Sequence, residues 1–505
     1  MKFNILKTKV NAVKNHEGAK ANLLTPEMEL YSAVVTGGLN DTFYEKNDAR
    51  VARIQQLMLK NSPEYVAKLA VYARNEMYMR SVPLVLAVEL AKANSGNAVV
   101  GKTVNGVVKR ADEIMELLAY YQLANNRTGT KKLNKLSKQI QKGLSEAFNS
   151  FDEYQFAKYN RDAEVKLRDA LFIVHPKAKD ETQQAIFNKI ANNTLDVPYT
   201  WETELSAAGQ VKYKNDKAKA IAMKEKWEEL IDSGKIGYMA LMRNLRNILE
   251  AKVSVDHVKK VCDYLADHKA VSGSKQLPFR YLAAYREVKE LKSEFVTMVL
   301  NALENAVVIS IINLKGFDVT TRVLIACDVS GSMQKPISAK SKVLLFDIGL
   351  MLGMLMQSKC KRVVSGMFGD TWKIINMPNR GVLANVEEYY KREGEVGYST
   401  NGYKVIDDLI RRKVIMDKIM LFTDCQMWDS NKGSSSLQAS WKAYKAIAPE
   451  AKLYLFDLAG YGNTPLKIQK NEVCLIAGWS DKVFDVLNAI ENGESAVEKI
   501  NQIEL

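Results

Sequence analysis

At Leu324-Ile-Ala-Cys-Asp-Val-Ser-Gly-Ser-Met333 the sequence changes from an apolar run to a cluster of oxygen-bearing side chains. The apolar part, residues 323–327, is long enough for a buried strand and too short for a helix of its own. Asp328, Ser330 and Ser332 then occupy alternate positions. Because alternate residues of an extended strand project to the same side, we expect one carboxylate and two hydroxyls to converge. Such an all-oxygen set suits Mg²⁺ or another hard divalent cation rather than zinc.

Two later segments complete this pattern. Residues 418–424 form a second apolar run that ends in an acid, Asp424, and the loop 397–402 offers the hydroxyl of Thr400. In open α/β sheets, ligands bind at the carboxyl ends of the strands. We therefore predict one metal site made of Asp328, Ser330, Ser332, Thr400 and Asp424. The alternative is that the two aspartates only cap helices and loops.

The first part of the chain, from about residue 24 to 310, has mostly helical patterns. Thr25-Pro26-Glu27 and Ser62-Pro63-Glu64 each place a capping hydroxyl before a proline and an acid, which marks a helix start. Many helices in close succession favour an α-solenoid of the HEAT type, and a compact irregular helical domain is the competing interpretation. Besides the helices that begin at these two signals, we expect helices at 48–60, 82–94, 102–122, 131–149, 163–174, 180–192, 217–231, 238–250, 254–267 and 277–292.

The second part alternates strands with helices. The change begins at about 307–320, where residues 307–314 and 321–327 are β-branched and apolar. Alternation of this kind predicts a mostly parallel, doubly wound sheet with helices on both faces. We place a helical domain at 1–315 and an α/β domain at 316–505. Within the latter we expect helices at 341–358, 403–413 and 437–447 and strands at 361–368, 418–423 and 451–458.

The charge of the chain is uneven. Its formal net charge is +14, with 48 basic against 37 acidic residues in 1–320 and 24 against 21 in 321–505. A polyanionic partner, if there is one, should therefore bind the helical part. The five cysteines are scattered and form no CxxC motif, which is typical of a reducing compartment. The N-terminus lacks an apolar signal segment, and no run approaches membrane-spanning length, so we expect a cytoplasmic protein without a membrane role.

Motifs for catalysis are scarce. The chain has neither HExxH nor GxSxG, so we expect no enzyme. Residues 96–103, Gly-Asn-Ala-Val-Val-Gly-Lys-Thr, match the phosphate-binding pattern GxxxxGK[ST]. That motif works only between a buried strand and a helix. The segment before it has helical spacing of Glu89 and Lys92, so we interpret 96–103 as a chance match between two helices, with Val99 and Val100 in a loop.

Basic side chains gather in one region of the helical part. Lysines recur at helical spacing between 131 and 142, and residues 154–161 interleave basic with aromatic side chains. Such a mixture can pair with phosphates and stack on bases, although a lysine face is often only solvated. His175 ends the following helix, where histidine is often a capping group.

The order of four segments resembles that of TROVE-module proteins of the Ro autoantigen family, in a bacterial or phage form. These are Thr25-Pro26, Gly237–Asn247, Leu277–Arg280 and Asp328–Met333, and the resemblance extends over nearly the whole chain. It implies a monomeric ring of helical repeats closed by a von Willebrand factor A domain with a metal-ion-dependent adhesion site. It also implies that single-stranded 3′ ends of misfolded RNAs enter the central hole. Small structured Y RNAs would bind the outer surface.

For the RNA-binding residues, the resemblance places Lys158, Arg161 and His175 on the outer surface, and the lysine face adds Lys131, Lys135 and Lys138. The threonine loop reads Tyr398-Ser399-Thr400, where the family has glycine-glycine-threonine. Two functions stay open. One is a ribonucleoprotein component that scavenges or tethers RNA and hands it to an exoribonuclease. The other is a metal-dependent protein-interaction scaffold without an RNA role.

Overall fold

The computed structural model describes residues 13–36, 47–126, 136–160, 163–276, 278–310, 320–337, 341–360, 362–378, 380–428, 436–478 and 483–505. Its first part is helical, as expected. The helices are α1 (Pro26–Val35), α2 (Asn47–Leu59), α3 (Pro63–Asn75), α4 (Ser81–Ala93), α5 (Ala98–Val107), α6 (Ala111–Ala124), α7 (Lys138–Phe148), α8 (Glu153–Tyr159), α9 (Leu167–Val174), α10 (Glu181–Asn192), α11 (Trp201–Gln210), α12 (Asp216–Asp232), α13 (Tyr238–Arg243), α14 (Leu245–Glu250), α15 (Val255–Leu265), α16 (His268–Ser274), α17 (Pro278–Lys289) and α18 (Val296–Ile309).

Both predicted helix starts are confirmed. The hydroxyl of Thr25 accepts a hydrogen bond from the backbone N–H of Met28, and that of Ser62 accepts one from Tyr65. In each helix the proline stands in the first turn, where its missing N–H leaves no bond unmade. These caps are local, which is why the sequence alone could place them.

The predicted helix 102–122 is wrong, because the structure has two helices there. α5 ends at Val107, and α6 begins at Ala111. The buried carboxylate of Glu113 accepts hydrogen bonds from the backbone N–H groups of Lys109 (2.8 Å) and Arg110 (3.0 Å). Likewise, 238–250 is divided at Asn244 into α13 and α14. Residues 307–309, expected to begin the change to strands, are the last turn of α18.

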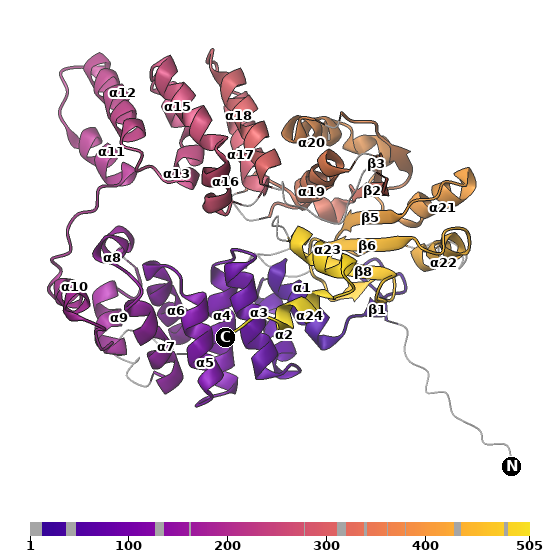
Figure 1. Cartoon of the computed structure of the whole chain (residues 1–505), viewed down its shortest axis with the longest axis horizontal. Coiled ribbons are helices and arrows are strands. Elements are labelled where there is room, and N and C mark those ends of the chain that lie inside the picture. The colour runs from indigo at the N-terminus through magenta and orange to yellow at the C-terminus, as the bar shows by residue number, and fades with distance from the viewer. Residues whose placement is uncertain are drawn as a thin grey trace.

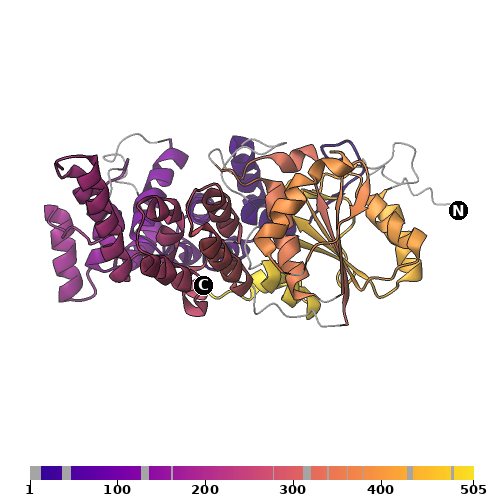
Figure 2. The same ribbon diagram turned by 90° about the horizontal axis from the view of Figure 1, so that it is seen from above.

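Successive helices pack on their near neighbours, as in a solenoid. α3 contacts α4 and α5, α4 contacts α6, and α5 contacts α7. Figure 1 shows two arms, α1–α10 and α11–α18, joined by the extended segment after α10, with the α/β domain at the opposite end. Seen from above, the arms and the α/β domain lie within one flattened body (Figure 2).

The α/β domain contains a six-stranded sheet in the order β4-β3-β2-β5-β6-β8, parallel except for the edge strand β4. The strands are β2 (Arg322–Asp328), β3 (Arg362–Phe368), β4 (Trp372–Ile374), β5 (Lys418–Thr423), β6 (Lys452–Asp457) and β8 (Val473–Ala477). The helices are α19 (Leu345–Lys359), α20 (Val382–Lys391), α21 (Tyr403–Arg412), α22 (Leu437–Ile447), α23 (Val483–Glu491) and α24 (Ala496–Asn501).

Alternate residues of the central strands belong to two separate cores. Ile325 and Cys327 lie with α19 and α20 in the core that continues into the helical arms, whereas Leu324 and Ala326 pack with α21 and α22. The sheet is therefore doubly wound, and this confirms the expected fold class.

The α/β domain contacts both arms and closes the chain on itself. On one side, β1 (Asn22–Leu23) pairs with β7 (Asn463–Thr464), and the Tyr31 hydroxyl donates to the carbonyl of Ala477. On the other side, the guanidinium of Arg286 in α17 donates two hydrogen bonds of 2.7 Å to the buried carboxylate of Asp347 in α19. The boundary predicted at 315/316 lies outside the described residues.

Candidate functional site

The five predicted metal ligands lie in three loops at the carboxyl end of the sheet. Asp328 ends β2, and Asp424 directly follows β5, its neighbour in the sheet. The chain leaves β2 toward β3 on one side and returns through β5 on the other, so the site lies at the switch point of the strand order. The backbone N–H of Gly331 donates to the carbonyl of Tyr398, which brings the loop of Thr400 to the same place.

The two serines converge, but by a different route from the one expected. The hydroxyl oxygens of Ser330 and Ser332 are 3.2 Å apart, and both residues are buried. Only Asp328 belongs to the strand, however, because Gly331–Gln334 forms a 3₁₀ turn. The backbone N–H of Ser330 donates to Asp328 Oδ1 at 2.9 Å, and this bond turns the chain out of the strand. The tight turn, and not an extended strand, therefore aligns the hydroxyls.

Among the described residues, no basic side chain pairs with the two carboxylates. Both are fully buried, and burial raises the pKa of each well above its usual value. Repulsion by Asp328 and, less strongly, by Asp457 raises the pKa of Asp424 further, and repulsion by Glu17 raises that of Asp328. Asp424 Oδ2 is buried and has no hydrogen-bond partner within the described residues. A buried, unpaired carboxylate oxygen is costly unless a proton or a cation neutralises it.

These residues fit a hard cation by their chemistry. Hydroxyl and carboxylate oxygens are its preferred ligands. Over the described ranges, no group of three or more His, Cys, Asp or Glu side chains is arranged to hold a metal. The predicted set has two acids and three hydroxyls, so it relies on Ser330, Ser332 and Thr400, and the metal stays a prediction. Thr423 was not predicted, yet its hydroxyl donates to Asp328 Oδ2 at 2.6 Å and fixes that carboxylate.

The predicted outer RNA-binding residues are described only in part. Lys131, Lys135 and Arg161 lie outside the described residues. Lys138 is exposed at the start of α7, and His175 is exposed in the left-handed conformation that ends α9. One turn after Lys138, the side chain of Gln141 donates to the carbonyl of Val174. Lys138 and His175 therefore lie on neighbouring ends of packed helices.

Lys158 belongs to a cluster of cations and aromatic rings. Its ammonium lies 5.6 Å from the ring centre of Tyr154 and 5.8 Å from that of Tyr159. The guanidinium of Arg110 lies 4.4 Å from the Tyr159 ring. Arg110 was not predicted, because it is 49 positions before Tyr159 and only the packing of α8 on α6 brings them together. The interleaving of basic and aromatic residues thus corresponds to real cation–π contacts.

The match to a phosphate-binding loop is part of a helix. Residues 98–103 belong to α5, so the loop expected at Val99 and Val100 is wrong, although the helix before it is confirmed. Gly101 of α5 and Gly143 of α7 allow close packing: a Cβ on Gly143 would lie 2.5 Å from the carbonyl oxygen of Gly101. The buried Thr103 hydroxyl donates to the carbonyl of Val99. These residues serve helix packing, and the element directly before them in the described part of the chain is the helix α4 and not the strand that a phosphate-binding loop requires.

None of the described helices has the length and apolar character that crossing a membrane requires.

A pocket lies between α13, α14 and α17 and was not predicted from the sequence. Its polar lining includes Arg243, Arg246 and Arg280. Its three arginines fall within two of the segments that carry the family resemblance, 237–247 and 277–280. Each arginine alone appears in the sequence as an ordinary solvated charge.

The chain is similar to proteins of known fold and family. Its fold is similar to the crystal structure of the Deinococcus radiodurans RO (RSR) protein, with a TM-score of 0.60 and 17% identity over 93% of this chain and 100% of that one. Two curated relatives are named telomerase protein component 1. The Mus musculus protein is 23% identical over 325 residues, and the Rattus norvegicus protein 24% over 311. These matches span 49% and 46% of this chain but only 12% and 11% of those relatives. Residues 30–226 and 191–343, together more than half of the chain, match the TROVE domain. The protein therefore belongs to the TROVE domain family.

Proposed function

We propose that this protein is a non-enzymatic, RNA-binding component of a cytoplasmic ribonucleoprotein. The observation that carries the proposal is the TROVE match, which covers the helical arms where the excess of positive charge is also found. Positive charge on a helical scaffold attracts the phosphate backbone without regard to sequence. Two relatives of the chain are protein components of telomerase.

We assign two binding modes to the helical arms. The outer mode takes small structured, Y-like RNAs through Lys131, Lys135, Lys138, Lys158, Arg161 and His175, mainly as phosphate contacts. The inner mode takes the single-stranded 3′ ends of misfolded RNAs, because a closed ring admits one strand more easily than a duplex. An exoribonuclease that receives these ends is the protein partner that this role would require.

We further propose that Asp328, Ser330, Ser332, Thr400 and Asp424 hold one Mg²⁺ or similar ion. Bound there, the ion would supply the positive charge that the two buried carboxylates lack. Each neighbouring group would then have one role at the ion. Thr423 and the Ser330 N–H orient Asp328, the two serine hydroxyls face each other, and the unpaired Asp424 oxygen is available as an acceptor.

The test is filter binding of a structured RNA and a single-stranded RNA at several salt concentrations. Lys138→Glu/Lys158→Glu should weaken the structured RNA about tenfold or more and spare the single strand, because charge reversal replaces two attractive phosphate contacts with repulsive ones. The matched control is Lys217→Glu/Lys219→Glu, which reverses two exposed charges on α12. If the unmodified protein binds neither RNA better than micromolar at low salt, the RNA role fails. The alternative, a metal-dependent scaffold for a protein partner, would then be the better explanation.

A further inference from the structure

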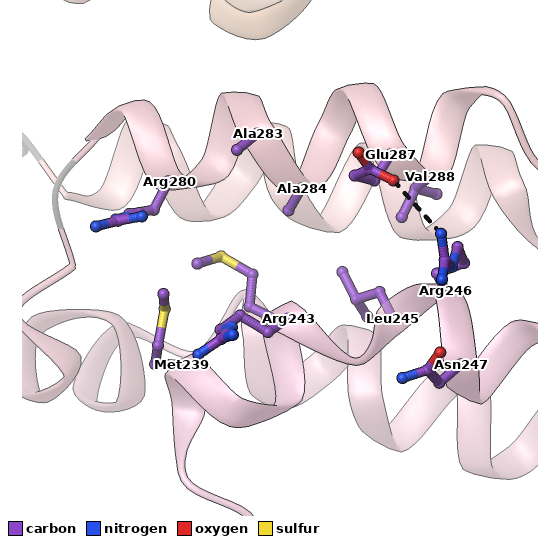
Figure 3. A pocket seen from close by; sticks show the side chains of 11 residues that line it. Met239, Arg243, Leu245, Arg246, Asn247, Arg280, Ala283, Ala284, Glu287 and Val288 are labelled. Atoms are coloured by element: carbon purple, nitrogen blue, oxygen red, sulfur yellow. Dashed lines mark ion pairs between the residues drawn. The ribbon is translucent and has the colours of Figure 1, made fainter. Parts of the chain in front are cut away.

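The pocket between α13, α14 and α17 has the size of a small-ligand site. Its volume is about 310 Å³, at the lower end of the range for ligand pockets. Figure 3 shows α17 on one side and α13 and α14 on the other, with the arginine side chains between them. In Figure 1, α13 and α17 belong to the layer of their arm that faces the α1–α10 arm.

The charge of this pocket is strongly positive. Three arginines line it against a single acid, Glu287. Glu287 is already engaged, because it pairs with Lys342 at 2.5 Å and with Arg246 at 4.0 Å. Within the described part of the chain, Arg243 and Arg280 form no ion pair. Partial burial and the charge of Arg243 lower the pKa of Arg280, so the two guanidinium groups repel one another. An anion placed between them would remove this repulsion.

The rest of the pocket wall is apolar and comes from all three helices (Figure 3). Met242, Leu245 and Val288 are buried there, and Met239, Ala283 and Ala284 are half-buried beside them. A simple anion would leave this surface unused, whereas a ligand with a flat apolar face could cover it. Asn247 adds an exposed amide, which can both donate and accept hydrogen bonds. Guanidinium groups beside an apolar wall and one amide suit a nucleotide, with its phosphate, its base face and its base edge.

We infer that this pocket binds one nucleotide of a single-stranded RNA, with the phosphate held by Arg243 and Arg280 and the base against the apolar wall. The inference rests on the proposed RNA-binding function and names the residues of its inner mode. A duplex would not suit the pocket, because its bases are paired and stacked and cannot enter singly. Arg246 and Glu287 also line the pocket, and their ion pair of 4.0 Å joins α14 to α17 beside it.

The experiment measures binding of a fluorescent single-stranded decamer by anisotropy, at several salt concentrations, for three proteins. These are the unmodified protein, Arg243→Gln/Arg280→Gln, and Lys217→Gln/Lys219→Gln as a charge-matched control. The pocket variant should lose about tenfold or more in affinity, because two charge-assisted contacts disappear. Its salt slope should decrease by about 0.7, the value for the one single-strand phosphate that the two arginines hold together. The control should change the affinity by less than about threefold.

Two further measurements distinguish the possible outcomes. A decamer with 4-thiouridine, irradiated and digested, should crosslink to the peptides of α13, α14 and α17, whereas crosslinks only elsewhere would overturn the inference. Uridine monophosphate should compete weakly, and competition as strong as that of the decamer would show that the pocket takes a free nucleotide instead. If the unmodified protein binds no single strand, the proposed function itself fails. If it binds but the pocket variant behaves like the control, only the nucleotide pocket is refuted.

Discussion

Replacing Gly143 with alanine should loosen the α1–α10 arm. The added Cβ would lie 2.5 Å from the carbonyl oxygen of Gly101 and 2.6 Å from Cβ of Val104, and neither atom can rotate away. Because both atoms are fixed, the overpacking should cost about 2–3 kcal/mol, the upper part of the usual range. The better helix propensity of alanine returns up to about 1 kcal/mol. We therefore expect a net loss of about 1–2 kcal/mol in the local free energy of opening of α5 and α7.

The assay is hydrogen exchange followed by mass spectrometry, because the effect is local and a single unfolding midpoint is poorly defined in a chain of this size. A loss of about 1–2 kcal/mol should speed exchange in α5 and α7 roughly 5- to 30-fold. Gly101→Ala should have a smaller effect, since the nearest atom to its Cβ is the movable end of Gln139. A Cβ added at Gly209 would have no atom within 4 Å, so Gly209→Ala is the matched control. Equal exchange in Gly143→Ala and Gly209→Ala would refute the argument.

Three other predictions concern the metal site, the glycine-rich match and the joint between α17 and α19. Asp328→Ala should abolish Mg²⁺ binding in calorimetry, and unchanged binding would remove this residue from the site. Lys102→Ala should leave any ATP-dependent signal as it was, whereas nucleotide-dependent protection of the surrounding segment from hydrogen exchange would contradict the helix-packing interpretation. Arg286→Met should lower the local free energy of opening of α17 and α19, measured by hydrogen exchange, by about 3–5 kcal/mol, because it leaves the buried carboxylate of Asp347 unpaired. Lys391→Met, which breaks an exposed pair, should cost about 0–1 kcal/mol, and similar losses for both variants would show that burial of the joint contributes little.

Sequence patterns predicted the features of the fold that are set by residues close together in the sequence or by the alternation of strands and helices. The caps at Thr25 and Ser62 needed only the next three residues, and the alternation after residue 320 was enough for a doubly wound sheet. The break between α5 and α6 could not be predicted, because the Glu113 carboxylate that stabilises it is held by Arg74, 39 positions earlier. The short helices α8 and α16 were also missed, since α16 buries only Val271 and α8 only Phe156.

In the candidate site, too, the sequence predicted what local patterns and strand order determine, but not what depends on distant contacts. Asp328 and Asp424 were predicted to meet because parallel strands align their carboxyl ends, and the structure places both at that edge. The 3₁₀ turn that aligns the two serines could not be predicted from a short sequence pattern. The same is true of the hydrogen bond from Thr423 to Asp328, because both depend on contacts formed in the folded protein. The arginine pocket was missed for a similar reason. Arg243 and Arg280 are 37 positions apart in the sequence, and only the packing of α17 on α13 and α14 brings them to one pocket.

The contact between the two ends of the chain has a consequence for how the protein is made. Tyr31 and its partner Ala477 are separated by 446 positions. A ribosome adds roughly 5–20 residues per second, so α1 must wait roughly 20–90 s for the strand against which it packs. During that time α1 can pack on α2 and α3, but the part of its surface that contacts β8 and α24 in the finished protein stays uncovered. The first of the described helices to be synthesised is therefore among the last to complete its packing.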